Sequence, residues 1–152
     1  MSRLQPFKKV ERRLAGKLKP KTSSKAAARM AQVRRAGTKP ELIVRAYLSA
    51  RGVRYRTQNR DLPGSPDLAN RTRQWAIFVH GCFWHQHTAC RFATKPKSNA
   101  KFWKAKFDAN RARDRRARKL LAATGFRVAT LWECEVTSER KLQRARDVIE
   151  SG

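Results

Sequence analysis

Four residues of the chain have the types and spacing of zinc ligands. Three lie within one short segment and the fourth comes from a distant part of the chain: Cys82, His87, Cys90 and Cys134. Zinc prefers thiolate and imidazole ligands, and four protein ligands leave no open position for substrate or water, so such a site is normally structural. His85 is an alternative to His87 as the histidine ligand. The competing interpretation is that Cys134 is a buried thiol and that the histidines are surface groups.

A second group of residues could hold a divalent cation and move a proton. His80 is the first polar side chain after the apolar run 75–79, which is typical of a strand covered on both faces. Asp67 follows Pro66 at the start of the preceding predicted strand. If the hairpin register brings the two together, Asp67 supplies an oxygen ligand and His80 a titratable imidazole. Taken singly, an Asp in a turn is more often a turn former.

A carboxylate interrupts the apolar stripe of a long predicted helix, residues 99–124. The stripe recurs in steps of four and three: Trp103, Phe107, Asn110, Asp114, Ala117 and Leu121. A buried Asp is costly unless it is paired, so Asp114 should face an imidazole or an arginine such as Arg113 or Arg118. An Asp–His pair would orient the ring and raise its basicity, which is how a histidine becomes a general base.

Glu41 has a structural explanation that the residues alone favour over a role as an active-site acid. Residues 38–41 place a capping Thr, a Pro in the first turn and a Glu three positions after Thr38. This order is typical of a helix N-terminus.

Two aromatic residues, Phe83 and Trp84, lie inside the segment that the zinc ligands would clamp. Aromatic side chains on such a loop, with basic neighbours, can stack on bases or wedge between them. Packing in the core explains either residue equally well.

The composition indicates a polyanionic partner. The net charge is +26, with 37 Lys and Arg against 11 Asp and Glu, which favours nucleic acid. No apolar run approaches the ~20 residues of a membrane span, and the basic N-terminus lacks the apolar segment of a signal peptide. We therefore expect an intracellular protein without a membrane partner. We also expect a monomer in the cytoplasm that associates with the nucleoid when bound to DNA.

The elements that must position these residues predict one α/β domain with a mixed sheet. Residues 1–25 read as a basic, disordered tail, which is either a solvated extension or an arm that follows phosphates, and residues 26–152 as the domain. In chain order we expect a helix at 26–35, a helix from 39 closed by Gly52, a strand at 53–56, a hairpin with its turn at 70–73, the helix at 99–124 stopped by Gly125, a strand at 127–132 and a helix at 138–150.

Several separated motifs occur in an order that a known family shares. They are Leu62-Pro63-Gly64-Ser65-Pro66-Asp67, Phe78-Val79-His80-Gly81-Cys82-Phe83-Trp84-His85, Phe102-Trp103, Asn110, Arg113-Asp114-Arg115-Arg116 and Leu131-Trp132-Glu133-Cys134. The chain thereby resembles the very short patch repair (Vsr) DNA mismatch endonucleases, across about residues 26–136. The resemblance implies the fold of type II restriction endonucleases. It also implies a magnesium-dependent enzyme that nicks one strand of double-stranded DNA 5′ to the thymine of a T:G mismatch left by deamination of 5-methylcytosine.

The resemblance implies a role for each candidate catalytic residue at its matching position. Asp67 resembles the carboxylate that binds magnesium (Mg²⁺), with the backbone carbonyl of Val79 beside it. His85 resembles the histidine that activates water, and Asp114 the acid that orients it. His80 resembles a second active-site histidine that assists at the scissile phosphate.

The resemblance extends to the metal-binding and DNA-binding positions. Glu41 falls at the position of a further active-site acid, which moves its interpretation towards function. The positions of the structural zinc (Zn²⁺) ligands are matched by Cys82, His87, Cys90 and Cys134, although the segment 85–90 is one residue longer than is usual in the family. DNA-contacting positions are matched by Phe83, Trp84, Trp103 and Asn110, of which the three aromatic residues resemble those that wedge into the duplex.

Two other classes of protein remain as alternatives. A non-catalytic, zinc-stabilised nucleic-acid-binding module would use the histidines only as ligands or for packing. A restriction endonuclease would cut both strands of unmodified sites and would need no mismatch.

Overall fold

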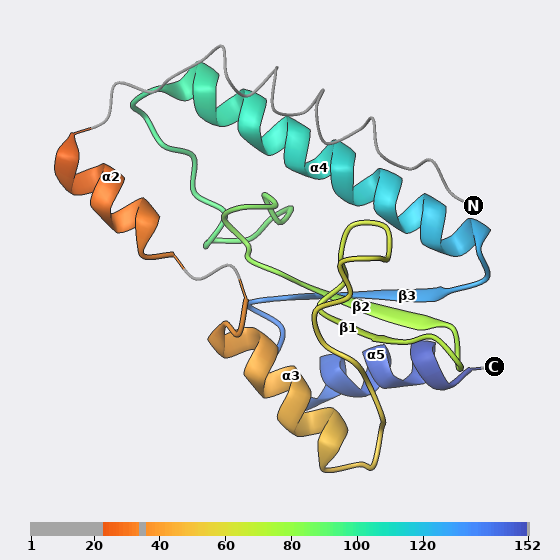
Figure 1. Cartoon of the computed structure of the whole chain (residues 1–152). Helices are drawn as coiled ribbons and strands as arrows, with labels where there is room; N and C mark the ends of the chain where they lie inside the picture. The colour runs from red at the N-terminus through yellow and green to blue at the C-terminus, as the bar shows by residue number, and fades with distance from the viewer. Residues whose placement is uncertain (1–22, 34–35, 152) are drawn as a thin grey trace.

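The computed structural model describes residues 23–33 and 36–151 (Figure 1). Its elements in chain order are α2 (Ser24–Ala31), α3 (Lys39–Ser49), β1 (Leu68–Asn70), β2 (Trp75–His80), α4 (Ala100–Ala123), β3 (Arg127–Trp132) and α5 (Glu139–Glu150). The predicted basic tail, residues 1–25, lies outside the described residues as far as residue 22. Helix α2 is capped by the Ser23 side chain and begins at Ser24, two residues earlier than predicted and within the predicted tail. No helix within the described ranges has both the length and the apolar character needed to cross a membrane.

The three strands form a mixed sheet in the order β1-β2-β3, which confirms the predicted α/β class. β1 and β2 are an antiparallel hairpin, with Leu68 opposite Ile77, and β3 runs parallel to β2, with His80 opposite Trp132. The predicted strand at 53–56 is reduced to a single bridge between Arg56 and Ala69. Pairing stops there because the next residues turn away from the sheet, with Gln58 in the left-handed region at φ 57°.

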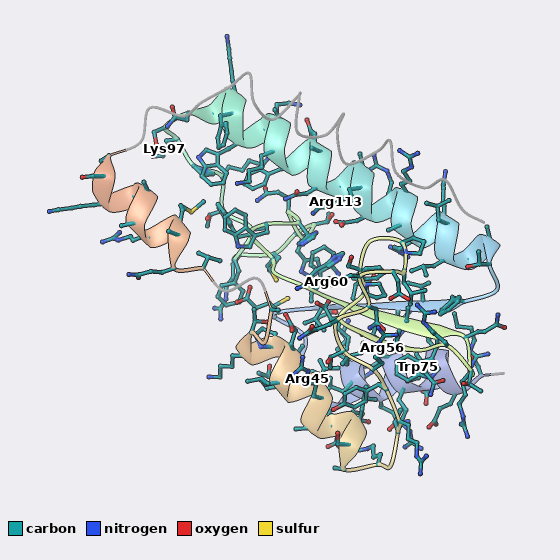
Figure 2. All side chains as sticks on the ribbon, viewed as in Figure 1. Arg45, Arg56, Arg60, Trp75, Lys97 and Arg113 are labelled. Carbon is teal, nitrogen blue, oxygen red and sulfur yellow. The ribbon has the colours of Figure 1, made fainter. Side chains whose placement is uncertain are left out.

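Helices cover both faces of the sheet (Figure 1). On one face α3 and α5 pack against alternate residues of β2, Trp75 and Ile77, and Figure 2 shows Trp75 beside α5. On the other face α4 packs against Ala76 and Phe78 through Ala117 and Leu121. Successive side chains of a strand point to opposite faces, so His80 follows Ala76 and Phe78 onto the face covered by α4.

Helix α4 confirms the predicted inward stripe and explains one glycine. Phe107, Ala117 and Leu121 are buried along the stripe. The turn that precedes β1 approaches α4 so closely that a Cβ on Gly64 would overlap the Cβ of Ala117, and Gly64 also has a φ of +72°. Only glycine meets both requirements at low cost. The turn carrying Asp67 is therefore packed directly against the helix carrying Asp114.

Candidate active site and metal centre

The candidate residues gather where β2 and β3 end side by side. The parallel register places His80 opposite Trp132, and the backbone N–H of Glu133 continues the pairing by donating to the carbonyl of His80 at 2.9 Å. Beyond these ends, Gly81 lets the chain turn into the loop that carries the remaining histidines and cysteines. Two clusters of chemically active side chains form there.

The first cluster joins His80, His85 and Asp114. His85 Nδ1 lies 2.5 Å from Asp114 Oδ2. The rings of His80 and His85 are stacked at 3.8 Å between centroids, with 5° between their planes. Of the two partners that the sequence left open for Asp114, the structure therefore places the imidazole, and not an arginine, against the carboxylate.

The protonation states of this cluster follow from burial and charge. Burial, and then the charge of His85, lower the pKa of His80 to about 4, so His80 is neutral at neutral pH. Burial raises the pKa of Asp114, but the hydrogen bond from His85 and nearby positive charge, chiefly that of His85, together bring it below its usual value. An ionised carboxylate only accepts hydrogen bonds, so Nδ1 of His85 is the donor. Nε2 is then the nitrogen that can accept a proton.

Asp67 lies immediately before β1 and is anchored to the neighbouring strand. Its Oδ2 accepts a 2.6 Å hydrogen bond from the backbone N–H of Val79. Burial is the main cause that raises the pKa of Asp67 to about 6. The hydrogen bond from Val79 and the charge of His85 oppose this rise, and the charge of Glu41 adds to it. Ionising this carboxyl group costs free energy because it is largely removed from water. A nearby cation would stabilise the ionised form.

Glu41 acts as a cap in the structure and also contributes charge to the site. Its two oxygens accept hydrogen bonds from the backbone N–H of Gly37, at 2.8 Å, and from the hydroxyl of Thr38, at 3.2 Å. The residue is buried in the first turn of α3, with Arg45 4.0 Å away. The Thr38 side chain makes no capping hydrogen bond of its own and instead donates to Glu41, so the predicted cap is only partly formed. The electrostatic effect of Glu41 on Asp67 keeps its predicted catalytic role open to test.

The second cluster is formed by the four predicted zinc ligands, whose donor atoms all lie within 4.8 Å of one another: Cys82, His87, Cys90 and Cys134. His87 Nδ1 is 3.7 Å from the Cys82 sulfur and 3.3 Å from the Cys134 sulfur. Tetrahedral zinc, with bonds of about 2.0–2.3 Å, separates its ligand atoms by roughly 3.3–3.8 Å. This donor set could therefore bind zinc. Of the two histidines left open, His87 lies with the cysteines and His85 with Asp114.

The predicted wedge residues form one aromatic cluster between the loop and the start of α4. Phe83 packs edge-on against Trp84 at 5.1 Å and against Trp103 at 5.5 Å, and all three are half-buried. Asn110 donates a 2.9 Å hydrogen bond to the carbonyl of Trp84. This hydrogen bond links the loop that carries Phe83 and Trp84 to α4. The DNA contacts predicted for these four residues stay predictions.

Sequence reasoning missed three residues that build the site. Asn59, almost fully buried, donates from its side chain to the carbonyl of Pro66 and so holds the turn before Asp67. Gln86 donates to the carbonyl of Phe83 at 2.8 Å and so closes the loop on itself. Trp132 stacks on the ring of His87. Only Trp132 carried a usable signal, because it ends a predicted strand two positions before Cys134, a predicted zinc ligand.

Comparison with known proteins gives a consistent result. A family model described as DNA mismatch endonuclease Vsr matches residues 18–91. The type II nicking enzyme V.XorIIP of Xanthomonas oryzae pv. oryzae is 46% identical over 122 residues, which are 80% of this chain and 89% of that protein.

Two further relatives have similar names. The type II nicking enzyme V.NmeAIP of Neisseria meningitidis serogroup A is 37% identical over 118 residues, 78% of this chain and 84% of that protein. The DNA mismatch endonuclease Vsr of Escherichia coli (strain K12) is 38% identical over 97 residues, 64% of this chain and 62% of that protein.

Proposed function

Because the chain belongs to the Vsr family of DNA mismatch endonucleases, we propose that it is a DNA endonuclease that nicks one strand of duplex DNA 5′ to the thymine of a T:G mismatch. The mismatch is the one left when 5-methylcytosine is deaminated. The single observation that carries this proposal is the pairing of His85 with Asp114, stacked on His80, at the strand ends where Asp67 is anchored. The relatives' names supply the class of substrate.

In the proposed reaction His85 is the general base. With Nδ1 donating to Asp114, Nε2 takes a proton from water as the water oxygen attacks phosphorus. The bond from phosphorus to the leaving oxygen breaks, and the leaving oxygen takes a proton from solvent water. His80 is neutral because its pKa is about 4. It can therefore donate a hydrogen bond to the scissile phosphate without placing a second positive charge beside His85.

We assign the magnesium site to Asp67 and the backbone carbonyl of Val79. The fit is chemical: Asp67 is a half-buried carboxyl group, and burial together with the charge of Glu41 raises its pKa to about 6. A divalent cation beside it would stabilise the ionised form. Magnesium is commonly held by one or two carboxylates together with substrate phosphate oxygens. When bound, the ion neutralises the charge that develops on the phosphate.

We assign zinc to the Cys/His cluster, in a structural role. Burial raises the pKa of the Cys82 thiol to about 12, so metal binding must displace a proton there. The clamped loop contains few buried apolar residues beyond Cys82. The binding free energy of structural zinc, on the order of 10 kcal/mol in small metal domains, would hold it in place.

DNA deformation is the proposed source of mismatch recognition. We propose that Phe83, Trp84 and Trp103 wedge into the duplex, which is easier at a T:G wobble because less stacking and pairing is lost. The net charge of +26 supplies affinity for phosphates at every sequence. We further propose a restriction-endonuclease-like core in residues 26–152, with residues 1–25 as a basic arm, in a monomer that acts on DNA in the cytoplasm.

The decisive experiment is a nicking assay on matched and T:G duplexes, with and without magnesium, using the zinc-loaded protein. We expect nicks only in the T:G duplex and only with magnesium. Asp67→Ala should abolish nicking with folding intact. Asp61→Ala is the matched control, because Asp61 lies in the same segment but is exposed and paired with Arg71.

The alternatives give different results in the same assay. A non-catalytic binding module would retain DNA affinity in the Asp67→Ala variant and show no nicking in the wild type. A restriction endonuclease would convert matched supercoiled plasmid to linear DNA. Loss of zinc from a His85→Ala variant would overturn the division of roles between His85 and His87.

A further inference from the structure

Trp132 lies between the two clusters and contacts a ring in each. Its indole is stacked on His87 at 4.1 Å, with 5° between the planes. It also meets His80 edge-on at 5.3 Å and 76°. No other aromatic ring among the described residues has ring contacts with histidines of both clusters.

The position of the Trp132 side chain is determined by the backbone pairing of β3 with β2 and by the turn that follows β3. The parallel register holds Trp132 opposite His80, and strand alternation puts both side chains on the face covered by α4. Beyond the strand the chain turns at once towards Cys134, and the backbone N–H of Trp132 donates to Glu135 at 3.3 Å. The indole is therefore held by the sheet on one side and by the metal-binding turn on the other.

The ring contacts form one unbroken series from the metal centre to the catalytic carboxylate. In order, its members are His87, Trp132, His80, His85 and Asp114. The hydrogen bond to Asp114 fixes one atom of the His85 ring but leaves rotation about that bond. The plane of His85 is set by stacking on His80, and His80 is bounded by Trp132 and by Phe78, whose ring lies at 5.8 Å.

We propose that Trp132 is a positioning residue that sets the ring planes of His80 and His85 and transmits to them the fixed position of His87. The activity part of this inference rests on the proposed nicking function. Removing the indole would leave space into which His80 can turn, and His85 would then lose its stacking surface. A displacement of about 1 Å at a reacting group can cost on the order of 10²-fold in rate.

The test compares Trp132→Leu and Trp132→Phe with the matched control Leu131→Ala. Leu131 precedes Trp132 on the same strand but is buried in the core on the opposite face. It therefore reports loss of stability without loss of the ring series. Phe keeps a flat ring that can stack on His87, whereas Leu fills part of the volume without a plane.

We expect Trp132→Leu to keep its zinc and its KM for the T:G duplex within about twofold and to lose at least about tenfold in kcat. Trp132→Phe should recover most of that loss, and Leu131→Ala should lower the melting temperature while keeping kcat. Equal losses of kcat in Trp132→Leu and Leu131→Ala, or a loss in proportion to zinc content, would mean that Trp132 only fills space.

A second readout does not depend on activity. Replacing zinc by the larger cadmium ion in the intact protein should shift the imidazole NMR signals of His80 in the wild type and in Trp132→Phe, but not in Trp132→Leu. Shifts of equal size in all three proteins would overturn the inference. If the wild type failed to nick T:G duplexes, the proposed function would fail, and this comparison would still decide the role of Trp132.

Discussion

Replacing Asp67 by Asn should stabilise the folded protein at neutral pH while abolishing nicking. Burial is the main reason that the pKa of Asp67 rises from 3.8 to about 6. The unfolded chain therefore releases this proton at a lower pH than the folded one, and the buried charge costs folding free energy above that pH. Asn resembles the protonated side chain in shape and can still accept the hydrogen bond from Val79, so it removes the charge and keeps the contact.

The expected size follows from that shift. A shift from 3.8 to about 6 corresponds to about 3 kcal/mol at pH 7.5, since each unit is 1.36 kcal/mol. For a chain of this length, that is a rise of roughly 6–12 °C in melting temperature. The folded state has the higher pKa, so ionisation of Asp67 destabilises it. This cost is absent only well below pH 3.8, grows mainly between about pH 4 and 6, and is nearly complete above about pH 7. At pH 5 the gap between variant and wild type should be about half its value at pH 7.5.

The assay is thermal unfolding followed by circular dichroism, in buffer that contains zinc and no magnesium. Asp61→Asn, at an exposed ion pair, should change stability by less than about 1 kcal/mol. Adding magnesium should stabilise the wild type, by about 2.7 kcal/mol at one hundred times the dissociation constant, and so narrow the gap to Asp67→Asn. The reasoning is refuted if Asp67→Asn is no more stable than the wild type at pH 7.5, or if the gap is the same at pH 5.

Three further predictions concern the other parts of the site. Gly64→Ala should destabilise the protein by about 1–3 kcal/mol in urea unfolding, because the new methyl group overlaps Ala117, and adding Ala117→Gly should recover part of the loss; an unchanged midpoint would contradict the close packing. Asp114→Asn should lower kcat by at least about 10²-fold with little change in KM. The amide has no negative charge to stabilise the His85 ring when it takes up a proton, and its NH2 group does not fix Nδ1 as the donor. A rise in KM alone would point to a DNA-binding role. His87→Ala should lose zinc on metal analysis and make the loop sensitive to proteolysis, whereas an unchanged zinc content would remove His87 from the ligand set.

The sequence determined the parts of this protein that depend on local spacing. The apolar run that becomes β2, the inward stripe of α4 and the capping turn at Glu41 were all readable, because each reflects a period or a short pattern within one element. The four zinc-like ligands were also recognisable as a set, because their types are rare and three of them are close together.

Only the tertiary structure decided how these parts meet. The residue types alone allowed Asp114 to pair with an arginine. The family resemblance implied His85, and the structure places His85, from 29 positions away, against the carboxylate. The fold also places His85 in one cluster and His87 in the other. It brings Asp67 within hydrogen-bond distance of the backbone N–H of Val79, and it places the ring of Trp132 between the two clusters. These contacts follow from the parallel register of β2 and β3 and from the contact of α4 with the turn at Gly64. Both join segments that are far apart along the chain, so neither leaves a local pattern in the sequence.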